Sequence, residues 1–162
     1  MTDTKKYDSI SEKQFHNRHP ELIVTKDPYQ CSFVDSSGTI FRAVPDFYDP
    51  KNSCYIEFKD GVLNTKPDKM SAIESSAKVQ QYKSDHNLNW TFKDAYQHDW
   101  NHSMFKQAAV QKRLAKKNIA MVVVFSDRSK LSQTNINRMA KCGLKWQYES
   151  AYFSQKSCTK TA

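Results

Sequence analysis

The chain has 162 residues, 38% of them hydrophobic and three of them glycine, which leaves room for one domain with one core. Lys and Arg outnumber Asp and Glu by 25 to 17, and the resulting charge of +8 favours a polyanion, above all a nucleic acid, as the partner. No apolar run reaches the roughly eighteen residues of a membrane span, and the sequence shows no apolar signal segment and no zinc-spaced cysteine pair. We therefore expect one cytoplasmic domain over residues 1–162, with no membrane partner.

The first part of the sequence predicts a short helix followed by three antiparallel strands. The helix runs from Ser9 to His19, and Ser11-Glu12-Lys13-Gln14 is close to a capping box. Residues typical of turns separate the strands at Ser36-Ser37-Gly38 and at Asp49-Pro50-Lys51-Asn52. The three strands run from Tyr29 to Asp35, from Thr39 to Asp46 and from Ser53 to Lys59.

The second part predicts helices that alternate with strands. One helix runs from Met70 to about His86, and a longer helix runs from Asp94 to Lys117. The apolar residues of the longer helix form a broad stripe that consists of Trp100, Met104, Phe105, Ala108 and Leu114.

A continuous β-branched run from Ile119 to Phe125 is typical of a strand buried on both faces. A helix from about Ser129 to Lys141, stopped by Gly143, and a strand from Leu144 to Ser150 complete the chain. A buried strand that follows a helical connection implies a sheet covered by helices. The order of elements predicts an α/β fold with a mixed central sheet flanked by helices, and a core over about residues 9–150.

Two short stretches, Pro45-Asp46 and Glu57-Phe58-Lys59, carry charged residues at the ends of the second and third predicted strands. Because side chains alternate along a strand, Glu57 and Lys59 point to one face, and antiparallel pairing brings Asp46 to the same face. Carboxylate oxygens suit Mg²⁺, which lowers the pKa of water and stabilises negative charge on phosphorus. A neighbouring lysine can orient the attacking water. The three side chains therefore predict phosphodiester hydrolysis.

The pattern of Pro-Asp, then Glu-x-Lys on the next strand, resembles the active-site signature of the PD-(D/E)XK nuclease superfamily. The predicted order from Ser9 to Ser150 also resembles the restriction-endonuclease-like α-β-β-β-α-β core of that superfamily. The resemblance implies an Mg²⁺-dependent DNA endonuclease, with Mn²⁺ as a substitute metal. It implies that Asp46, Glu57 and the backbone carbonyl of Phe58 hold the metal, and that Lys59 positions the nucleophile.

Relatives in that superfamily often place a further acidic residue on the first helix. Glu12 is our candidate for this role, with Glu21 as the rival and helix capping as the alternative role of Glu12. For contact with DNA phosphates we expect a band of basic residues on two helices and the loop beside the buried strand. The band consists of Lys106, Lys112, Arg113, Lys116, Lys117, Arg128, Lys130 and Arg138.

A compact chain with no recognition domain resembles junction resolvases, repair nickases and phage or mobile-element endonucleases. This resemblance implies structure-selective or weakly sequence-specific cleavage. A homodimer would allow two strands to be cut by two sites. One alternative is a non-catalytic nucleic-acid-binding domain on the same fold. Another is a basic interaction domain in which Pro-Asp is a turn opener and Glu-x-Lys is the solvated face of an edge strand.

Overall fold

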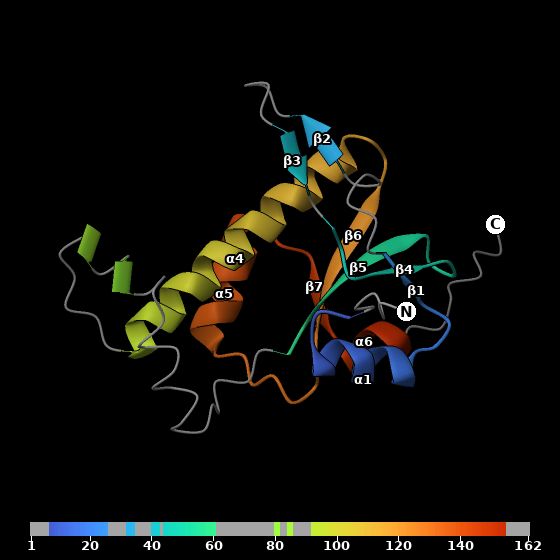
Figure 1. Ribbon diagram of the computed structural model, residues 1–162, viewed down its shortest axis with the longest axis horizontal. Coiled ribbons are helices and arrows are strands. Elements are labelled where there is room, and N and C mark those ends of the chain that lie inside the picture. Colours follow the sequence, from blue (N-terminus) through green and yellow to red (C-terminus); the bar gives the residue numbers. More distant parts are fainter. Residues whose placement is uncertain are drawn as a thin grey trace, which may run out of the picture.

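The computed structural model describes residues 7–25, 32–34, 40–42, 44–60, 80–81, 84–85 and 92–154. It has an α/β fold with a mixed, open, five-stranded sheet flanked by helices, which confirms the predicted fold class (Figure 1). None of the described helices is long and apolar enough to cross a membrane. The named elements are α1 (Ile10–Arg18), β1 (Ile23–Val24), β2 (Ser32–Val34), β3 (Ile40–Arg42), β4 (Phe47–Asp49), β5 (Cys54–Lys59), α4 (Phe92–Ala115), β6 (Ala120–Phe125), α5 (Gln133–Cys142), β7 (Trp146–Tyr148) and α6 (Glu149–Ser154).

The main sheet has the strand order β1-β4-β5-β6-β7, so β5 lies at its centre. The pairs β1–β4 and β4–β5 are antiparallel, and the pairs β5–β6 and β6–β7 are parallel. A parallel pair needs a crossover connection, and α4 and α5 lie in the connections that lead into β6 and β7. Strands β2 and β3 form a separate two-stranded antiparallel sheet.

Helices cover both faces of the main sheet, as Figure 1 shows. On one face, Phe15 of α1 and Tyr152 of α6 pack with Ile56 and Phe58 of β5 and with Val124 of β6. The opposite face packs against α4 and α5 through Met104, Ala108, Val123, Phe125 and Met139. Alternate residues of β5 and β6 therefore serve two separate hydrophobic layers, which makes the strand register part of the core.

The prediction of a strand that ends at Asp46 is wrong both in the extent of the strand and in the sheet that it joins. Strand β3 ends at Arg42 and pairs with β2, whereas the strand beside β5 is β4, which begins at Phe47. Proline has no backbone N–H to donate to a ladder, so Pro45 breaks the strand between the two sheets. Its carbonyl accepts a hydrogen bond from the Thr25 hydroxyl instead. Asp46 therefore precedes a strand of the main sheet and does not end one.

The predicted turn between the two site strands is present as residues 50–53. The Asp49 carboxylate accepts hydrogen bonds from the backbone N–H of Lys51 at 3.0 Å and from the side-chain amide of Asn52 at 2.7 Å. Such a local side-chain bond stabilises a turn after an aspartate. The turn sets the β4–β5 register, in which Phe47 is opposite Ile56 and Asp49 is opposite Cys54.

Helix α1 and helix α4 confirm their predictions to within two residues at each end. Phe105, however, is 61% exposed, so it does not belong to the buried stripe of α4. The helix predicted from Met70 to His86 lies largely outside the described residues, although residues 80–81 and 84–85 are helical.

The boundaries of the C-terminal helix and strand differ from the predicted ones. Helix α5 begins at Gln133, four residues later than predicted. Ser132 caps it, because its hydroxyl accepts a hydrogen bond from the Asn135 N–H at 3.2 Å. The last strand ends at Tyr148, because Glu149 and Ser150 begin α6. The Asp127 carboxylate accepts from the backbone N–H of Ser150 at 3.1 Å, which satisfies a donor in the first turn of that helix.

Gly143 ends α5 in the left-handed region at φ 74°, as the predicted stop requires. A Cβ atom there would meet Lys112 Cε only at 3.9 Å, so substitution costs backbone strain and no clash. We expect Gly143→Ala to destabilise the protein by about 1 kcal/mol, which lowers the urea midpoint by about 0.5 M. Lys141→Ala, at an exposed position of the same helix, should change stability by less than about 0.5 kcal/mol. An unchanged midpoint in Gly143→Ala would contradict this account of the helix end.

Candidate functional site

The β4–β5 ladder places Asp46 beside the strand that carries Glu57 and Lys59. Phe47 is opposite Ile56, so continuing the register by one residue sets Asp46 opposite Glu57. The Asp46 carboxylate accepts a hydrogen bond from the backbone N–H of Phe58 at 2.8 Å. The aspartate thus binds the central strand at the point where its own strand begins.

Glu57 and Lys59 lie on the face of β5 that α4 covers. Their neighbours Ile56 and Phe58 are buried on the other face, against α1 and α6. The Lys59 ammonium lies 3.2 Å from Glu57 Oε1, and the two side chains are 31% and 14% exposed. A small cavity of about 120 Å³ opens beside Glu57, and Val44, Pro45, Lys106 and Gln107 are among the residues that line it. The ion pair is therefore partly shielded from solvent but accessible from one side.

Glu12 reaches Asp46 from α1. One carboxylate oxygen from each of Asp8, Glu12 and Asp46 lies within 4.8 Å of the other two. Glu12 is also part of a helix cap, since its N–H donates to the Ser9 hydroxyl at 3.2 Å and its carboxylate accepts from the Asp8 N–H at 2.9 Å. The capping residue is Ser9, not Ser11 as the sequence suggested. Capping and a place in the acidic cluster are thus compatible for Glu12.

The rival residue Glu21 lies elsewhere. Its carboxylate is 4.0 Å from the His19 ring and its side chain is 55% exposed. Asp8, by contrast, is a member of the cluster that sequence reasoning missed. The capping box formed by Ser9 and Glu12 is the signal that could have found it, because Asp8 directly precedes the cap and shares that end of the helix.

The electrostatics of the site are those of crowded carboxylates. Burial, followed by the charges of Glu57 and Glu12, raises the pKa of Asp46 to about 8, although the Phe58 N–H and Lys59 oppose the shift. Burial likewise raises the pKa of Glu57, against the attraction of Lys59 and Lys106. Raised values mean that both anions lack enough positive charge in their surroundings. Such shifts in a cleft mark a candidate site for chemistry.

The donor atoms at this site fit a divalent cation. Asp8, Glu12 and Asp46 offer carboxylate oxygens close enough to share a cation, and such oxygens are the hard ligands that Mg²⁺ prefers. Glu57, opposite Asp46 on β5, lies outside this group of described residues. The carbonyl of Lys59 accepts from Ser126 N–H at 2.9 Å, toward β6. Because successive carbonyls of a strand point to opposite edges, the Phe58 carbonyl faces the edge where its N–H meets Asp46. A cation at that edge would offset the burial and the carboxylate repulsion that together raise both pKa values.

The predicted basic band divides into two parts. Arg128 donates to Asp60 Oδ1 at 3.0 Å and lowers the pKa of that carboxyl, so its charge is already matched within the protein. The exposed cations of the band lie on α4 and just after it, in the loop before α5, and on α5. They are Lys106, Lys112, Lys116, Lys117, Lys130 and Arg138.

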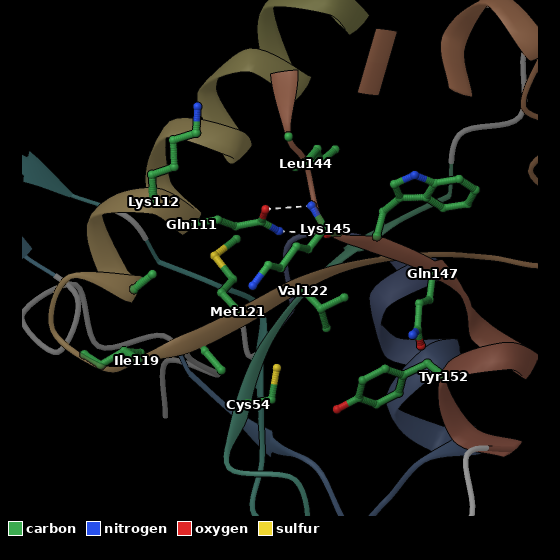
Figure 2. A pocket seen from close by; sticks show the side chains of 14 residues that line it. Cys54, Gln111, Lys112, Ile119, Met121, Val122, Leu144, Lys145, Gln147 and Tyr152 are labelled. Carbon is green, nitrogen blue, oxygen red and sulfur yellow. Dashed lines mark hydrogen bonds between the residues drawn. The ribbon is translucent and has the colours of Figure 1, made fainter. Parts of the chain in front are cut away.

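A larger cavity of about 670 Å³ lies away from the carboxylates (Figure 2). It is lined by the first residues of β5 and β6, by the end of α4 and by β7, whereas Glu57 lies near the other end of β5. Gln111 fixes its rim by two hydrogen bonds to the Lys145 backbone, at 2.8 and 2.9 Å. None of its described lining residues is acidic, so this cavity offers no carboxylate ligand for a metal.

No family model, curated protein or solved structure matches the chain significantly. The chemistry assigned to the site therefore rests on its own residues and their geometry.

Proposed function

We propose that the protein is a metal-dependent nuclease that hydrolyses phosphodiester bonds in DNA. The observation that supports this most is the position of Asp46, directly before β4, opposite Glu57 of the adjacent strand β5, with Lys59 at 3.2 Å from Glu57. Two crowded carboxylates with raised pKa values and one amine are costly to hold together unless a site uses them. The PD-(D/E)XK resemblance of the same residues agrees with this proposal.

Each residue of the site has a distinct role in the proposed reaction. Asp46, Glu57 and the Phe58 carbonyl would hold Mg²⁺ or Mn²⁺, and Glu12 would support it from α1. When bound, the cation supplies Lewis-acid stabilisation of charge on the phosphate and lowers the pKa of water. The Phe58 N–H fixes the Asp46 carboxylate at 2.8 Å, which leaves its other oxygen for a ligand. Lys59, held by Glu57, would orient the attacking water and stabilise the developing anion.

The substrate we propose is DNA cut with structural rather than strict sequence selectivity. The exposed lysines of α4 would neutralise phosphates, and such contacts carry no sequence information. A homodimer would supply a second site for cutting both strands of a duplex. The second candidate function is non-catalytic nucleic-acid binding, which the same basic surface favours and which needs no intact carboxylate pair.

A plasmid-nicking assay tests the proposal directly. We expect the protein to convert supercoiled plasmid to nicked or linear forms with Mg²⁺ or Mn²⁺, and to leave it intact in EDTA. A gel shift with a four-way junction, run beside it, separates the candidates. Binding without cleavage in every metal would select the non-catalytic domain, and neither binding nor cleavage would leave a basic interaction domain with a chance motif.

Cation binding should also stabilise the folded protein. A ligand at one hundred times its Kd adds about 2.7 kcal/mol, which corresponds to a rise in Tm of about 5–10 °C for a domain of this size. We expect this shift with Mn²⁺ in the wild type and a smaller shift in Glu12→Gln. Glu21→Gln is the matched control, because Glu21 pairs with His19 outside the cluster and should keep the full shift. A full shift in Glu12→Gln would remove Glu12 from the cation site.

A further inference from the structure

The outer face of α4 combines exposed lysines with an exposed aromatic ring. Residues three and four positions apart align on a helix. Phe105, Ala109 and Lys112 are exposed residues of α4 with this spacing, so they form one stripe along the helix, and the exposed Lys116 continues it just past the helix end. Lys106 and Lys117 are also exposed and lie on the adjacent stripe. We call these six residues the α4 face.

Apart from Lys106, which lies beside Glu57, the lysines of the α4 face have no matching charge in the described part of the chain. None of its four lysines forms an ion pair with a described residue, in contrast to Arg128, which is bound to Asp60. The span from Lys106 to the end of α4 at Ala115 measures about 14 Å at the rise of an α-helix, which equals roughly four steps of a nucleic acid strand, and Lys116 and Lys117 follow directly. A row of unmatched cations of this length suits a polyanionic strand better than a single small anion.

Phe105 is unusual for its surroundings. With 61% of its surface exposed, it packs into none of the hydrophobic clusters of the described residues, whereas Met104 and Ala108 of the same helix are buried in the core. An aromatic ring exposed to this extent loses most of the stabilisation that full burial would give it. Both features suit single strands, in which bases stack on aromatic rings while cations hold the backbone.

The α4 face begins at the proposed active site. Lys106, next to Phe105 in sequence, lines the cavity beside Glu57. Lys112 and Lys116 lie further along the helix, so the lysines lead away from the carboxylates in one direction. A strand that follows them would arrive at Glu57 and Lys59 with Phe105 close by.

We propose that the α4 face binds a nucleic acid strand with unpaired bases, and that Phe105 stacks on a base next to the bond that is cut. This inference rests on the proposed nuclease function and narrows its substrate to single strands, flaps and junctions. In continuous duplex every base is stacked on its neighbours and offers no free face to Phe105. Lys112 and Lys116 can contact the phosphates of a duplex as well as those of a single strand. The ring of Phe105 is therefore the group that distinguishes unpaired bases from duplex.

Binding in EDTA, without hydrolysis, tests the inference on the full chain. The probes are a fluorescent DNA fork with a single-stranded flap and a blunt duplex of equal length. Phe105→Ala should weaken binding of the fork about 5- to 100-fold and change binding of the duplex less than twofold, whereas Phe105→Trp should bind both as the wild type does. Ile23→Ala, which truncates another exposed apolar residue on β1, is the matched control and should have no effect.

The lysines have a separate signature. Lys112→Ala combined with Lys116→Ala should lower the slope of log K against log salt by about 1.4 on the fork, whereas Phe105→Ala should leave the slope unchanged. Lys51→Ala combined with Lys141→Ala removes two exposed lysines outside the α4 face and outside the basic band, and should leave both affinity for the fork and slope nearly unchanged. The fluorescence of 2-aminopurine, a base analogue placed beside the fork, should be quenched when the wild type binds. This quenching should be lost when Phe105→Ala binds.

Several outcomes would overturn the inference. If the wild type cleaves DNA with Mg²⁺ and Phe105→Ala binds the fork as tightly as the wild type, the proposed role of the α4 face in binding unpaired bases is wrong. The nuclease proposal then stands. If Phe105→Ala dissociates a dimer without changing fork affinity, the face is a contact between two copies of the chain. If the wild type neither binds nor cleaves any DNA, the proposed function fails and this inference fails with it.

Discussion

Asp46→Asn should reduce metal-dependent DNA cleavage by a factor of about a thousand or more, while the protein stays folded. The substitution removes one anionic ligand but keeps an oxygen that can accept from the Phe58 N–H, which Asp46 binds at 2.8 Å. A loss of this size equals about 4 kcal/mol of transition-state stabilisation, in the range expected when an electrostatic contributor to a reaction is removed. Cleavage of plasmid under single-turnover conditions measures it.

The same variant should be more stable than the wild type at high pH when no cation is present. The pKa of Asp46 is raised from 3.8 to about 8, first by burial and then by Glu57, so the folded state holds this proton more tightly than the unfolded state. The resulting stabilisation is complete below the unfolded pKa and is lost as pH rises toward about 8, at up to about 1.4 kcal/mol per pH unit. Asparagine carries no charge, so Asp46→Asn does not suffer this loss of stability as pH rises.

Urea denaturation in EDTA between pH 4 and pH 9 tests the sign. We expect the difference in free energy of unfolding between Asp46→Asn and the wild type to grow with pH and to level off above about pH 8. Asp85→Asn, on an exposed helical residue, is the matched control and should show no such trend. Full cleavage activity in Asp46→Asn would remove the proposed site, and a stability difference that falls with pH would refute its electrostatics.

The sequence predicted the layered α/β fold and the neighbourhood of Asp46 and Glu57 because local signals determine both. Alternation along β5 separates Ile56 and Phe58 from Glu57 and Lys59, and the Asp49 turn sets the hairpin register. The prediction that Asp46 ends a strand beside β5 was wrong. The segment from Thr39 to Val44 has high β-propensity, and this propensity does not indicate which sheet the segment joins. Only tertiary pairing decides between β2 and β5 as its neighbour.

Three features depend on contacts between residues far apart in the chain, and the sequence pattern does not contain them. Asp8 joins Asp46 across the gap between α1 and the sheet. Helix α6 begins where a strand was predicted, because Glu149 binds Arg18 and His19 of α1 at 2.7 and 2.8 Å. Phe105 fits the apolar stripe of α4 by type and spacing, yet it is 61% exposed and lies outside the hydrophobic clusters of the described residues. Periodicity identifies which residues can be buried, and packing decides which are.

Lys59→Met should lower the turnover of DNA cleavage about 100- to 1000-fold with little change in DNA affinity. Methionine keeps the length and the apolar stem of the side chain but removes the ammonium group that lies 3.2 Å from Glu57. A group that acts on charge developing in the transition state affects kcat more than KM. Lys51→Met, in the exposed turn between β4 and β5, is the matched control and should cleave as the wild type does.

Loss of Lys59 should also make stability more sensitive to pH, and this effect separates its electrostatic role from its proposed chemistry. Burial raises the pKa of Glu57 and Lys59 opposes that shift, so Lys59→Met raises the pKa of Glu57 further. Because a raised carboxyl pKa costs stability as pH rises, the variant should lose stability relative to the wild type with rising pH. Adding Glu57→Gln to Lys59→Met should restore stability but not cleavage. Recovery of cleavage in that double variant would show that neither side chain takes part in hydrolysis.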